Sequence, residues 1–415
     1  MSSSFDYFFN SRTTPTTIAA VRGEPLAAAL QAYAQHLHQD GYAVHSGFMQ
    51  LRLLGCFNKW LLQKDLKRAD LDSVIVQQYL RWREQNGKLR RGDSATLSAL
   101  LRFLRPGSSA TPSPPVTAAD VALMQFQDYL RQDRSLAEAT VINYTPIVRA
   151  FLTDRFPAGR LHWPQVSATD IAAFVRRQAA VVTSKRATVV VSALRCFLHY
   201  LFYRGATKVD LAACVPTIAT WSLSDLPKCL ASEQIQKVLD SCDRKTAIGR
   251  RDYALLLLLA RLGLRAGEVV ALTLDDIDWD AGLITVRGKG KRVVQMPLPA
   301  EVGTAIADYL STARPLCASR HVFIRATAPL RGFANSVAVC SLVDRALERA
   351  GVESTFRGSH VFRHSLASLM LEREASLPEI GDVLRHRNPD TTRIYAKVDL
   401  LALRSIALPW PGGNQ

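Results

Sequence analysis

This sequence of 415 residues lacks most features that mark a secreted, membrane or zinc-binding protein. Its seven cysteines form no CxxC pair, so we expect reduced thiols rather than disulfides or a zinc site. The longest apolar run, residues 253–260, is far shorter than the ~20 residues that a membrane-spanning helix needs. The first residues contain no basic segment followed by an apolar stretch, which argues against a signal peptide. These absences favour a cytoplasmic protein without a membrane partner.

Acidic residues are also scarce relative to basic ones. The chain has 52 Lys and Arg against 36 Asp and Glu, a net charge of +16. The surplus is spread along the whole sequence rather than confined to one tail, which suits several domains that line one long polyanion. Nucleic acid is therefore the first candidate partner. A soluble protein that merely has a high isoelectric point remains the alternative on charge alone.

An uncharged, proline-rich segment, residues 106–117, divides the first half of the chain and is predicted to be a linker. The same amphipathic helical pattern stands on both sides of it, and residues 71–80 align with residues 166–175 at an offset of 95. We interpret this as a duplicated helical unit. The predicted parts are an N-terminal tail (1–24), a helical domain (25–105), the linker and a second helical domain (118–222).

From residue 228 the pattern changes. Helical segments are followed by two β-branched runs around Gly288, Lys289 and Gly290, which is typical of a β-hairpin, and then by further helices. This predicts an α+β domain over residues 228–398 and a C-terminal tail over 399–415. The predicted fold class is mainly α, with two helical units, which the basic surplus makes candidates for DNA binding, followed by a helical domain that carries a small antiparallel sheet.

Several residues of this last domain could carry chemistry. Arg265 and Glu268 are three apart, so on a helical turn the carboxylate could orient the guanidinium. Lys289 stands between two glycines at the hairpin tip. His360 and Arg363 open a helical segment, where they could form a phosphate site. Taken singly, each has an ordinary structural explanation, such as an ion pair or a solvated turn lysine.

The segment LRHRNPDTTRIYAKVD adds His386 and, nine residues later, Tyr395. A half-buried aromatic side chain is the ordinary reading of this tyrosine, and His364 is expected to pack or cap. The order of the whole set is more informative than any member. The candidate catalytic residues are Arg265, Lys289, His360, Arg363, His386 and Tyr395, with Glu268 in support.

In this order and setting, the set resembles the tyrosine recombinase, or phage-type integrase, family. The resemblance covers residues 228–398, including the words GLRAGEVVALTLDDID and LRHRNPDTTRIYAKV, and extends to a core-binding helical domain over residues 118–205. It implies that Tyr395 attacks a DNA phosphate and forms a 3′-phosphotyrosyl bond. His360 would assist proton removal, Lys289 would protonate the leaving 5′ oxygen, and His386 would hydrogen-bond a phosphate oxygen.

The physical chemistry of these residues agrees with such roles. Arg265 and Arg363 are permanent cations that can neutralise the non-bridging phosphate oxygens. A covalent phosphotyrosyl link conserves the phosphodiester energy, and the chain has no Walker motif, so no cofactor, metal or ATP is expected. The resemblance further implies double-stranded DNA as partner and a homo-tetramer, alone or with sister recombinases, that works through a Holliday junction at the nucleoid.

Two other functions stay open at this point. A type IB topoisomerase-like enzyme would have a similar active-site set but would relax DNA without a defined site. A DNA-binding regulator could retain the fold after losing catalysis. Four aspartates, at positions 275, 276, 278 and 280, could also suggest a divalent-metal nuclease, but adjacent carboxylates point in different directions. We expect Asp275 and Asp276 to be cap and turn residues.

Basic residues outside the last domain are candidates for DNA backbone contacts. They lie at the ends of predicted helices in both helical units, where a solvated helix face is the alternative. The candidates are Arg176, Arg177, Lys185 and Arg186 in the second unit and Lys88, Arg90 and Arg91 in the first. The role of the first unit, extra DNA contact or docking between protomers, stays open, although the duplication hints at a mobile-element recombinase.

Overall fold

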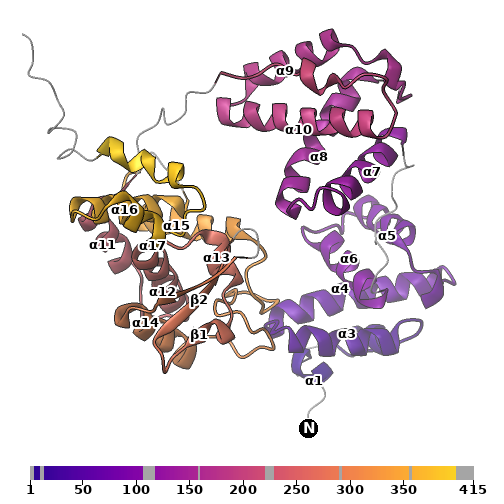
Figure 1. Ribbon diagram of the computed structural model, residues 1–415. Coiled ribbons are helices and arrows are strands. Elements are labelled where there is room, and N and C mark those ends of the chain that lie inside the picture. Colours follow the sequence, from indigo (N-terminus) through magenta and orange to yellow (C-terminus); the bar gives the residue numbers. More distant parts are fainter. Residues whose placement is uncertain are drawn as a thin grey trace, which may run out of the picture. The chain divides into compact units, whose positions relative to one another are not determined.

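The structure is a computed structural model (Figure 1). It describes residues 4–9, 14–105, 117–157, 159–219, 229–288, 292–354 and 358–398. The chain divides into two compact units. One comprises Met1–Ala110 together with Asp225–Gln415, and the other comprises Thr111–Ser224. The linker predicted over 106–117, except Thr117, and the tail over 399–415 lie outside the described residues.

The N-terminal region is a bundle of helices. They are α1 (Ser4–Phe8), α2 (Pro15–Arg22), α3 (Ala27–Gln39), α4 (Val44–Gln63), α5 (Ser73–Gln85) and α6 (Asp93–Leu104), with a 3₁₀ turn, η1 (Arg68–Asp70). The segment expected to be a tail therefore contains two helices. Both pack on α4, because its Gly47 leaves room for the ring of Phe8 and its Gly55 for Val21.

The second helical region repeats the order found from α3 to α6, which is two helices, a 3₁₀ turn and two helices, and adds a further 3₁₀ turn. Its elements are α7 (Ala118–Gln132), α8 (Glu138–Arg155), η2 (Trp163–Gln165), α9 (Ala168–Val181) and α10 (Ser184–Tyr203), followed by η3 (Leu211–Cys214). The N-cap of α5 is Asp72 and that of α9 is Ser167, and each side chain accepts a backbone N–H of its helix. These caps stand 95 residues apart, the offset found in the sequence, and each follows a 3₁₀ turn.

The last region combines helices with one small sheet. Its helices are α11 (Ser232–Asp240), α12 (Ala247–Leu262), α13 (Ala266–Ala271), α14 (Ala300–Thr312), α15 (Ser336–Arg349), α16 (His360–Glu372) and α17 (Leu377–Val383), with 3₁₀ turns η4 (Leu274–Asp276), η5 (Pro389–Thr391) and η6 (Arg393–Val398). Strands β1 (Ile277–Asp278), β2 (Leu283–Arg287) and β3 (Val293–Pro297) form an antiparallel sheet in the order β1-β2-β3. The predicted fold class, including the hairpin, is confirmed.

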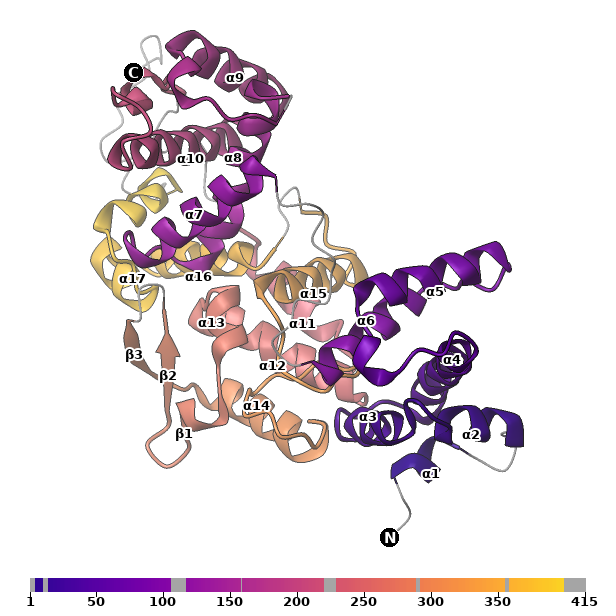
Figure 2. The same ribbon diagram turned by 90° about the vertical axis from the view of Figure 1, so that its right-hand side faces the viewer.

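Helix α12 is the centre of this region. Its leucines at positions 255–259 are all buried, because the helix packs against α14 on one side and α16 on another (Figure 2). The helix ends at Gly263, whose φ of +56° is a left-handed conformation that favours glycine. A side chain there would also meet Leu384. This stop places Arg265 directly beyond the end of α12.

No helix in the described ranges is both long and apolar enough to cross a membrane.

Candidate active site

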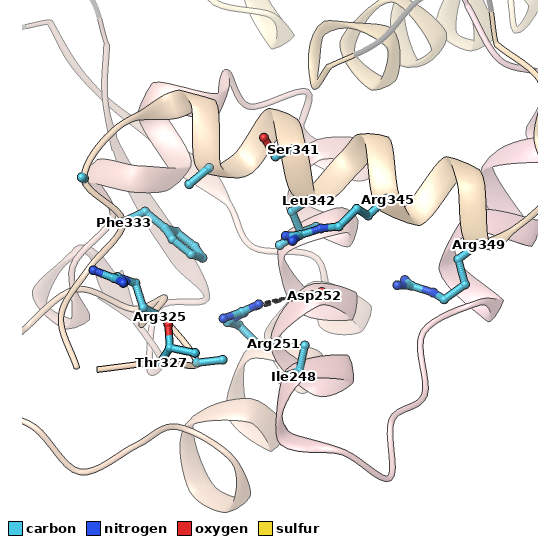
Figure 3. A pocket seen from close by; sticks show the side chains of 13 residues that line it. Ile248, Arg251, Asp252, Arg325, Thr327, Phe333, Ser341, Leu342, Arg345 and Arg349 are labelled. Carbon is cyan, nitrogen blue, oxygen red and sulfur yellow. Dashed lines mark hydrogen bonds and ion pairs between the residues drawn. The ribbon is translucent and has the colours of Figure 1, made fainter. Parts of the chain in front are cut away.

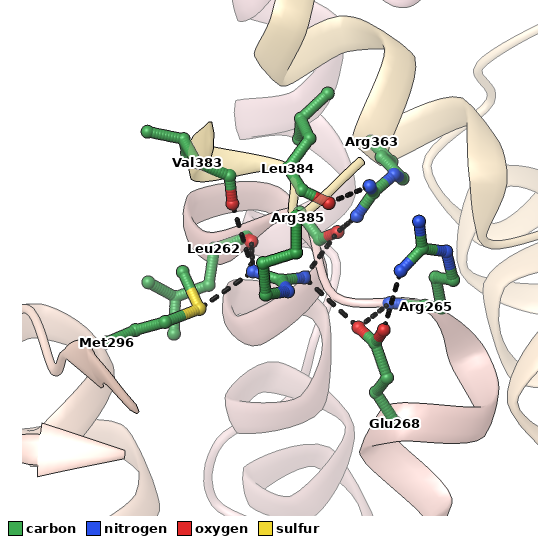
Figure 4. A network of polar contacts seen from close by, with 9 residues as sticks. Leu262, Arg265, Glu268, Met296, Arg363, Val383, Leu384 and Arg385 are labelled. Carbon is green, nitrogen blue, oxygen red and sulfur yellow. Dashed lines mark hydrogen bonds and ion pairs between the residues drawn. The ribbon is translucent and has the colours of Figure 1, made fainter. Parts of the chain in front are cut away.

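Arg363 belongs to a polar cluster at the end of α12 (Figure 4). Its side chain is only 4% exposed. Nη1 donates to the carbonyl of Gly263 at 2.5 Å, and Nη2 donates to the carbonyl of Leu384. Through these bonds the first turn of α16 is joined to the end of α12 and to the end of α17.

The charge of Arg363 is poorly compensated. Desolvation by burial, and then the neighbouring cations Arg265 and Arg385, lower the pKa of its guanidinium to about 9. The group remains a cation at neutral pH, since that value is still well above 7. A buried cation whose charge is costly gains most from an anion, so this environment favours phosphate binding.

Arg265 is the more accessible guanidinium of the cluster. It forms the N-cap of α13, and its Nη1 donates to Oε1 of Glu268 at 2.7 Å. Oε2 of Glu268 accepts the backbone N–H of Arg265 at 2.9 Å. Burial opposes ionisation of Glu268, but this backbone bond and the charge of Arg385 outweigh it and lower the pKa of the carboxyl. The carboxylate is thus ionised and holds Arg265 in place, as the sequence spacing suggested.

Two histidines face the same charges. His360 begins α16, and desolvation, followed by Arg363 and Arg265, lowers its pKa. His386 follows α17, and its Nδ1 lies 2.7 Å from Oγ1 of Thr392. Desolvation and, next, Arg363 lower the pKa of His386 to about 4. Both imidazoles are therefore neutral at neutral pH and can accept or donate a hydrogen bond.

Tyr395 lies in η6 and is 1% exposed. Its ring packs with Ala367, Ile380 and Leu384 in a small apolar cluster. Its hydroxyl lies 2.9 Å from Nδ1 of His364. Desolvation raises the pKa of the phenol to about 12, and the charge of Arg363 works in the opposite direction. The phenol is therefore protonated at neutral pH in this arrangement.

The structure thus brings together Arg265, Arg363, His360, His386 and Tyr395. The charge of at least one of the two guanidiniums lowers the pKa of each imidazole and opposes the rise in the pKa of the phenol. Lys289 lies outside the described residues. The strands that lead to it, β2 and β3, pair through Arg287 and Val293, and beyond that pair the N–H of Gly288 donates to the carbonyl of Arg292 at 2.8 Å.

Sequence reasoning missed two residues of this cluster. His364 contacts the tyrosine hydroxyl instead of only packing or capping. Arg385 is buried and reaches Glu268 with its Nη2 at 3.1 Å. The available signal was adjacency, because each residue stands next to a motif residue, Arg363 or His386. A local pattern could not show that either side chain points inward.

The carboxylates of the aspartate-rich turn form local capping bonds and ion pairs. Asp276 accepts both the backbone N–H and the hydroxyl of Thr273 and pairs with Arg287. Asp275 pairs with Arg320, and Asp278 accepts the N–H of Ala281. The residues that the structure describes contain no group of three or more His, Cys, Asp or Glu side chains that could hold a metal ion.

The candidate DNA contacts in the helical units are surface residues. Arg176, Arg177, Lys185 and Arg186 are all exposed on α9 and α10, and Arg177 pairs with Asp154. In the N-terminal region, Lys88 lies over the ring of Trp82. Lys88 and Arg90 also line a groove of about 390 Å³ together with Arg52, and Arg91 is exposed. These positions leave DNA contact a prediction.

A second basic cavity lies at the other end of α12 (Figure 3). It has a volume of about 710 Å³, and its cationic lining residues are Arg251, Arg325, Arg345 and Arg349. Arg251 is 7% exposed and donates through Nε and Nη2 to Asp252. At 1.5 Å per residue, Arg251 and Gly263 are about 18 Å apart along the helix axis. This cavity is therefore distinct from the cluster around Arg363.

The chain combines a helical region with an α+β domain that carries a three-stranded sheet. Two arginines, two histidines and a tyrosine meet at one helix end of that domain. This arrangement is that of a tyrosine-type DNA strand-transfer enzyme. Residues 228–400 match the phage integrase family, and residues 123–205 match the SAM-like N-terminal domain of phage integrases. The chain belongs to this family, and it is a tyrosine-type site-specific recombinase.

Similar proteins cover between about two thirds and nearly all of this chain. The integrase/recombinase y4rA of Sinorhizobium fredii is 47% identical over 395 residues, covering 94% of this chain and 96% of that protein. The tyrosine recombinase XerC of Pseudomonas aeruginosa is 31% identical and covers 68% of this chain and 91% of its own length. Among solved structures, the XerH recombinase bound to its difH substrate has a TM-score of 0.54 at 16% identity and covers 80% of this chain and 93% of its own.

Proposed function

We propose that this recombinase cuts and rejoins double-stranded DNA through Tyr395 and a 3′-phosphotyrosyl intermediate, without metal or ATP. The observation that carries the proposal is the convergence of Tyr395 with Arg265, Arg363 and two neutral histidines at one end of α12. A protein that only bound DNA would not need a tyrosine beside two guanidiniums and two imidazoles.

The two arginines bind the scissile phosphate. Arg265 keeps Nε and Nη2 without a protein acceptor in the described part of the chain, so both can donate to phosphate oxygens. Arg363, in the first turn of α16, supplies a second positive charge, which is buried. During attack, negative charge builds up on the non-bridging oxygens, and fixed cations in a desolvated site stabilise that charge more than water does.

The transfer step follows from the remaining groups. Tyr395 Oη forms a bond to phosphorus while its proton leaves with help from His360, and the bond from phosphorus to the 5′ oxygen breaks. Lys289 gives a proton to that oxygen. When Thr392 donates to Nδ1 of His386, the imidazole proton resides on Nε2, which can donate to a phosphate oxygen. Attack by a 5′ hydroxyl of another strand then reverses the step and frees Tyr395.

We place this reaction in a homo-tetramer, alone or with sister recombinases, that exchanges strands through a Holliday junction in the cytoplasm at the nucleoid. A similar fold supports the proposal, since lambda integrase has been solved as a tetramer bound to a Holliday junction, with a TM-score of 0.52 and 16% identity. Exposed cations of the helical units, such as Arg176 and Arg186, would bind the flanking DNA backbone.

A strand-exchange assay tests this proposal. Two linear DNAs carrying the ends of the protein's own genetic element are incubated with the full chain in EDTA and without ATP, and recombinant products are resolved by length. We expect products with wild type and none with Tyr395→Phe. Supercoiled plasmid is incubated in parallel, and its relaxation whatever its sequence, without recombinant products from the linear DNAs, would instead support the topoisomerase-like activity. Equal behaviour of both proteins would support the regulator.

A further inference from the structure

Arg385 occupies an unusual place for an arginine. It follows α17, is 9% exposed, and has a φ of +56°, a left-handed conformation that side chains other than glycine rarely adopt. A buried cation in such a backbone conformation persists only where its surroundings hold it. The side chain therefore has partners that account for its position.

The guanidinium of Arg385 is held mainly by backbone carbonyls and by one carboxylate (Figure 4). Its only anionic partner in the described residues is Glu268, whose Oε2 lies 3.1 Å from Nη2. The other contacts are with the carbonyls of Leu262 (3.3 Å), Gly263 (3.4 Å) and Val383 (3.0 Å) and with the thioether of Met296. Nε has no partner in the described part of the chain. Arg385 is thus fixed, and its charge is directed at Glu268.

Glu268 is shared between two guanidiniums. Oε1 accepts from Nη1 of Arg265 at 2.7 Å, and Oε2 accepts both from the buried Arg385 and from the backbone N–H of Arg265. Because Arg385 provides the side-chain donor to Oε2, beside the backbone N–H of Arg265, the guanidinium of Arg265 pairs with this carboxylate through a single nitrogen. The rest of its guanidinium remains available for a ligand.

We propose that Arg385 is a positioning residue that acts through Glu268 to keep the guanidinium of Arg265 open toward the scissile phosphate. This rests on the proposed function of Arg265. Without Arg385, Glu268 would be a buried carboxylate with one remaining cationic partner. The two would then pair side by side through two parallel hydrogen bonds, the geometry that arginine and carboxylate favour. Arg265 would be neutralised locally and turned away from phosphate.

If Arg385 had a purely structural role, its loss would act through domain stability, as the loss of any buried arginine would. Arg251 provides the matched control for that case. Arg251 is also a buried arginine of the same domain, it also pairs with a carboxylate, Asp252, and it also donates to a carbonyl, that of Ile324. It lies at the other end of α12, away from the cluster. Arg251→Met therefore reports the effect of losing a buried arginine without touching the proposed phosphate site.

The experiment measures single-turnover formation of the covalent adduct on saturating nicked DNA from the element ends, with DNA affinity and thermal unfolding measured in parallel. The variants are Arg385→Met, Arg385→Lys, Glu268→Gln, the double variant Arg385→Met/Glu268→Gln, and Arg251→Met. Arg385→Gly is added because glycine adopts the φ of +56° without strain. Any loss it shows comes from the missing guanidinium.

We expect Arg385→Met and Arg385→Gly to slow adduct formation at least tenfold with DNA affinity changed less than twofold, and Arg385→Lys to recover part of the rate. In the Glu268→Gln background, the further effect of Arg385→Met should be below threefold, because no carboxylate remains to capture Arg265. Arg251→Met should lower the unfolding temperature but keep the rate of the folded protein.

An equal loss from Arg385→Met in both backgrounds, or no loss at all, would overturn the positioning role. If Arg251→Met lost as much of the rate of adduct formation, the effect would be assigned to domain stability, and the positioning role would be overturned as well. Absence of adduct with wild type would contradict the proposed function instead, so the two failures are distinguishable.

Discussion

The Nδ1 atom of His364 lies 2.9 Å from the hydroxyl of Tyr395. The bond joins the helix that carries His360 and Arg363 to the 3₁₀ turn that carries the tyrosine. It fixes the direction of a phenol that is otherwise surrounded by apolar side chains. His364 thereby determines where the proposed nucleophile points.

Replacing His364 should slow cleavage without preventing DNA binding. We expect His364→Ala to lower the rate of adduct formation about tenfold, since a hydrogen bond of roughly 1 kcal/mol is lost and the phenol becomes free to turn. His364→Asn keeps a short polar side chain on the same helix and should retain more of the rate. Single-turnover kinetics on nicked DNA measure both variants, and a wild-type rate in His364→Ala would contradict the role.

Replacing Arg363 by lysine should make the reaction newly sensitive to pH. Lysine has an ordinary pKa of about 10.4, below that of arginine. The desolvation and neighbouring cations that lower the pKa of Arg363 would also lower the pKa of a lysine at this position, toward neutral pH. Part of the lysine population would then be uncharged. We expect a loss of at least about 100-fold at pH 8. The ratio of variant to wild-type rate should improve as the pH falls toward 6.5.

A pH-rate profile of both proteins measures this ratio. Wild type serves as the control for the other titrating groups, because the ratio cancels their contribution. A ratio that does not change with pH would mean that the lysine keeps its charge, and thus that the site is less desolvated than the burial of Arg363 implies.

Acid should destabilise the catalytic domain through His386. The pKa of this histidine is about 4 in the folded protein, below its ordinary value of 6.5. The folded state therefore favours the neutral imidazole, and this contribution to stability is present above pH 6.5 and is lost as the pH falls toward 4. We expect the unfolding temperature to fall across that window. His386→Gln, which cannot titrate, should show a smaller fall, and an identical fall would contradict the assignment.

The stability of the N-terminal helical region should depend on one buried ion pair. Nε of Arg83 lies 2.9 Å from Oδ2 of Asp93, and both side chains are about nine-tenths buried. Removing one partner of a buried pair costs about 3–5 kcal/mol because the other charge stays behind. We expect Arg83→Met to lower amide-exchange protection in α5 and α6 by at least about 100-fold. Removal of Arg22 from the exposed pair Arg22–Asp6 is the control. Unchanged amide-exchange protection in Arg83→Met would refute the argument.

Much of the fold could be predicted because it is encoded locally. Residue types that cap helices, such as Asp72 and Ser167, mark where α5 and α9 begin. The glycine-flanked lysine between two β-branched runs marks the hairpin. The helices α1 and α2 were missed because Phe8 and Val21 are buried by packing on α3 and α4, including close approaches to Gly47 and Gly55, which are far away in the sequence.

The candidate site could be predicted only in part, for a related reason. Arg265, His360, Arg363, His386 and Tyr395 stand in recognisable words of sequence. The inward direction of Arg385 depends on a left-handed backbone conformation and on Glu268, which is 117 residues away. The partner of His364 is 31 residues away. Contacts of this kind arise from tertiary packing and leave no local pattern.

The most direct test of the account is covalent trapping on DNA from the ends of the protein's own genetic element. Wild type and Tyr395→Phe are incubated with end-labelled nicked DNA and resolved on a denaturing gel, and the linked peptide is then identified by mass spectrometry. The account predicts a protein-linked band with wild type, attached through Tyr395 to a 3′ phosphate, and no band with the variant. A band that persists in Tyr395→Phe, or a link to another residue, would contradict it.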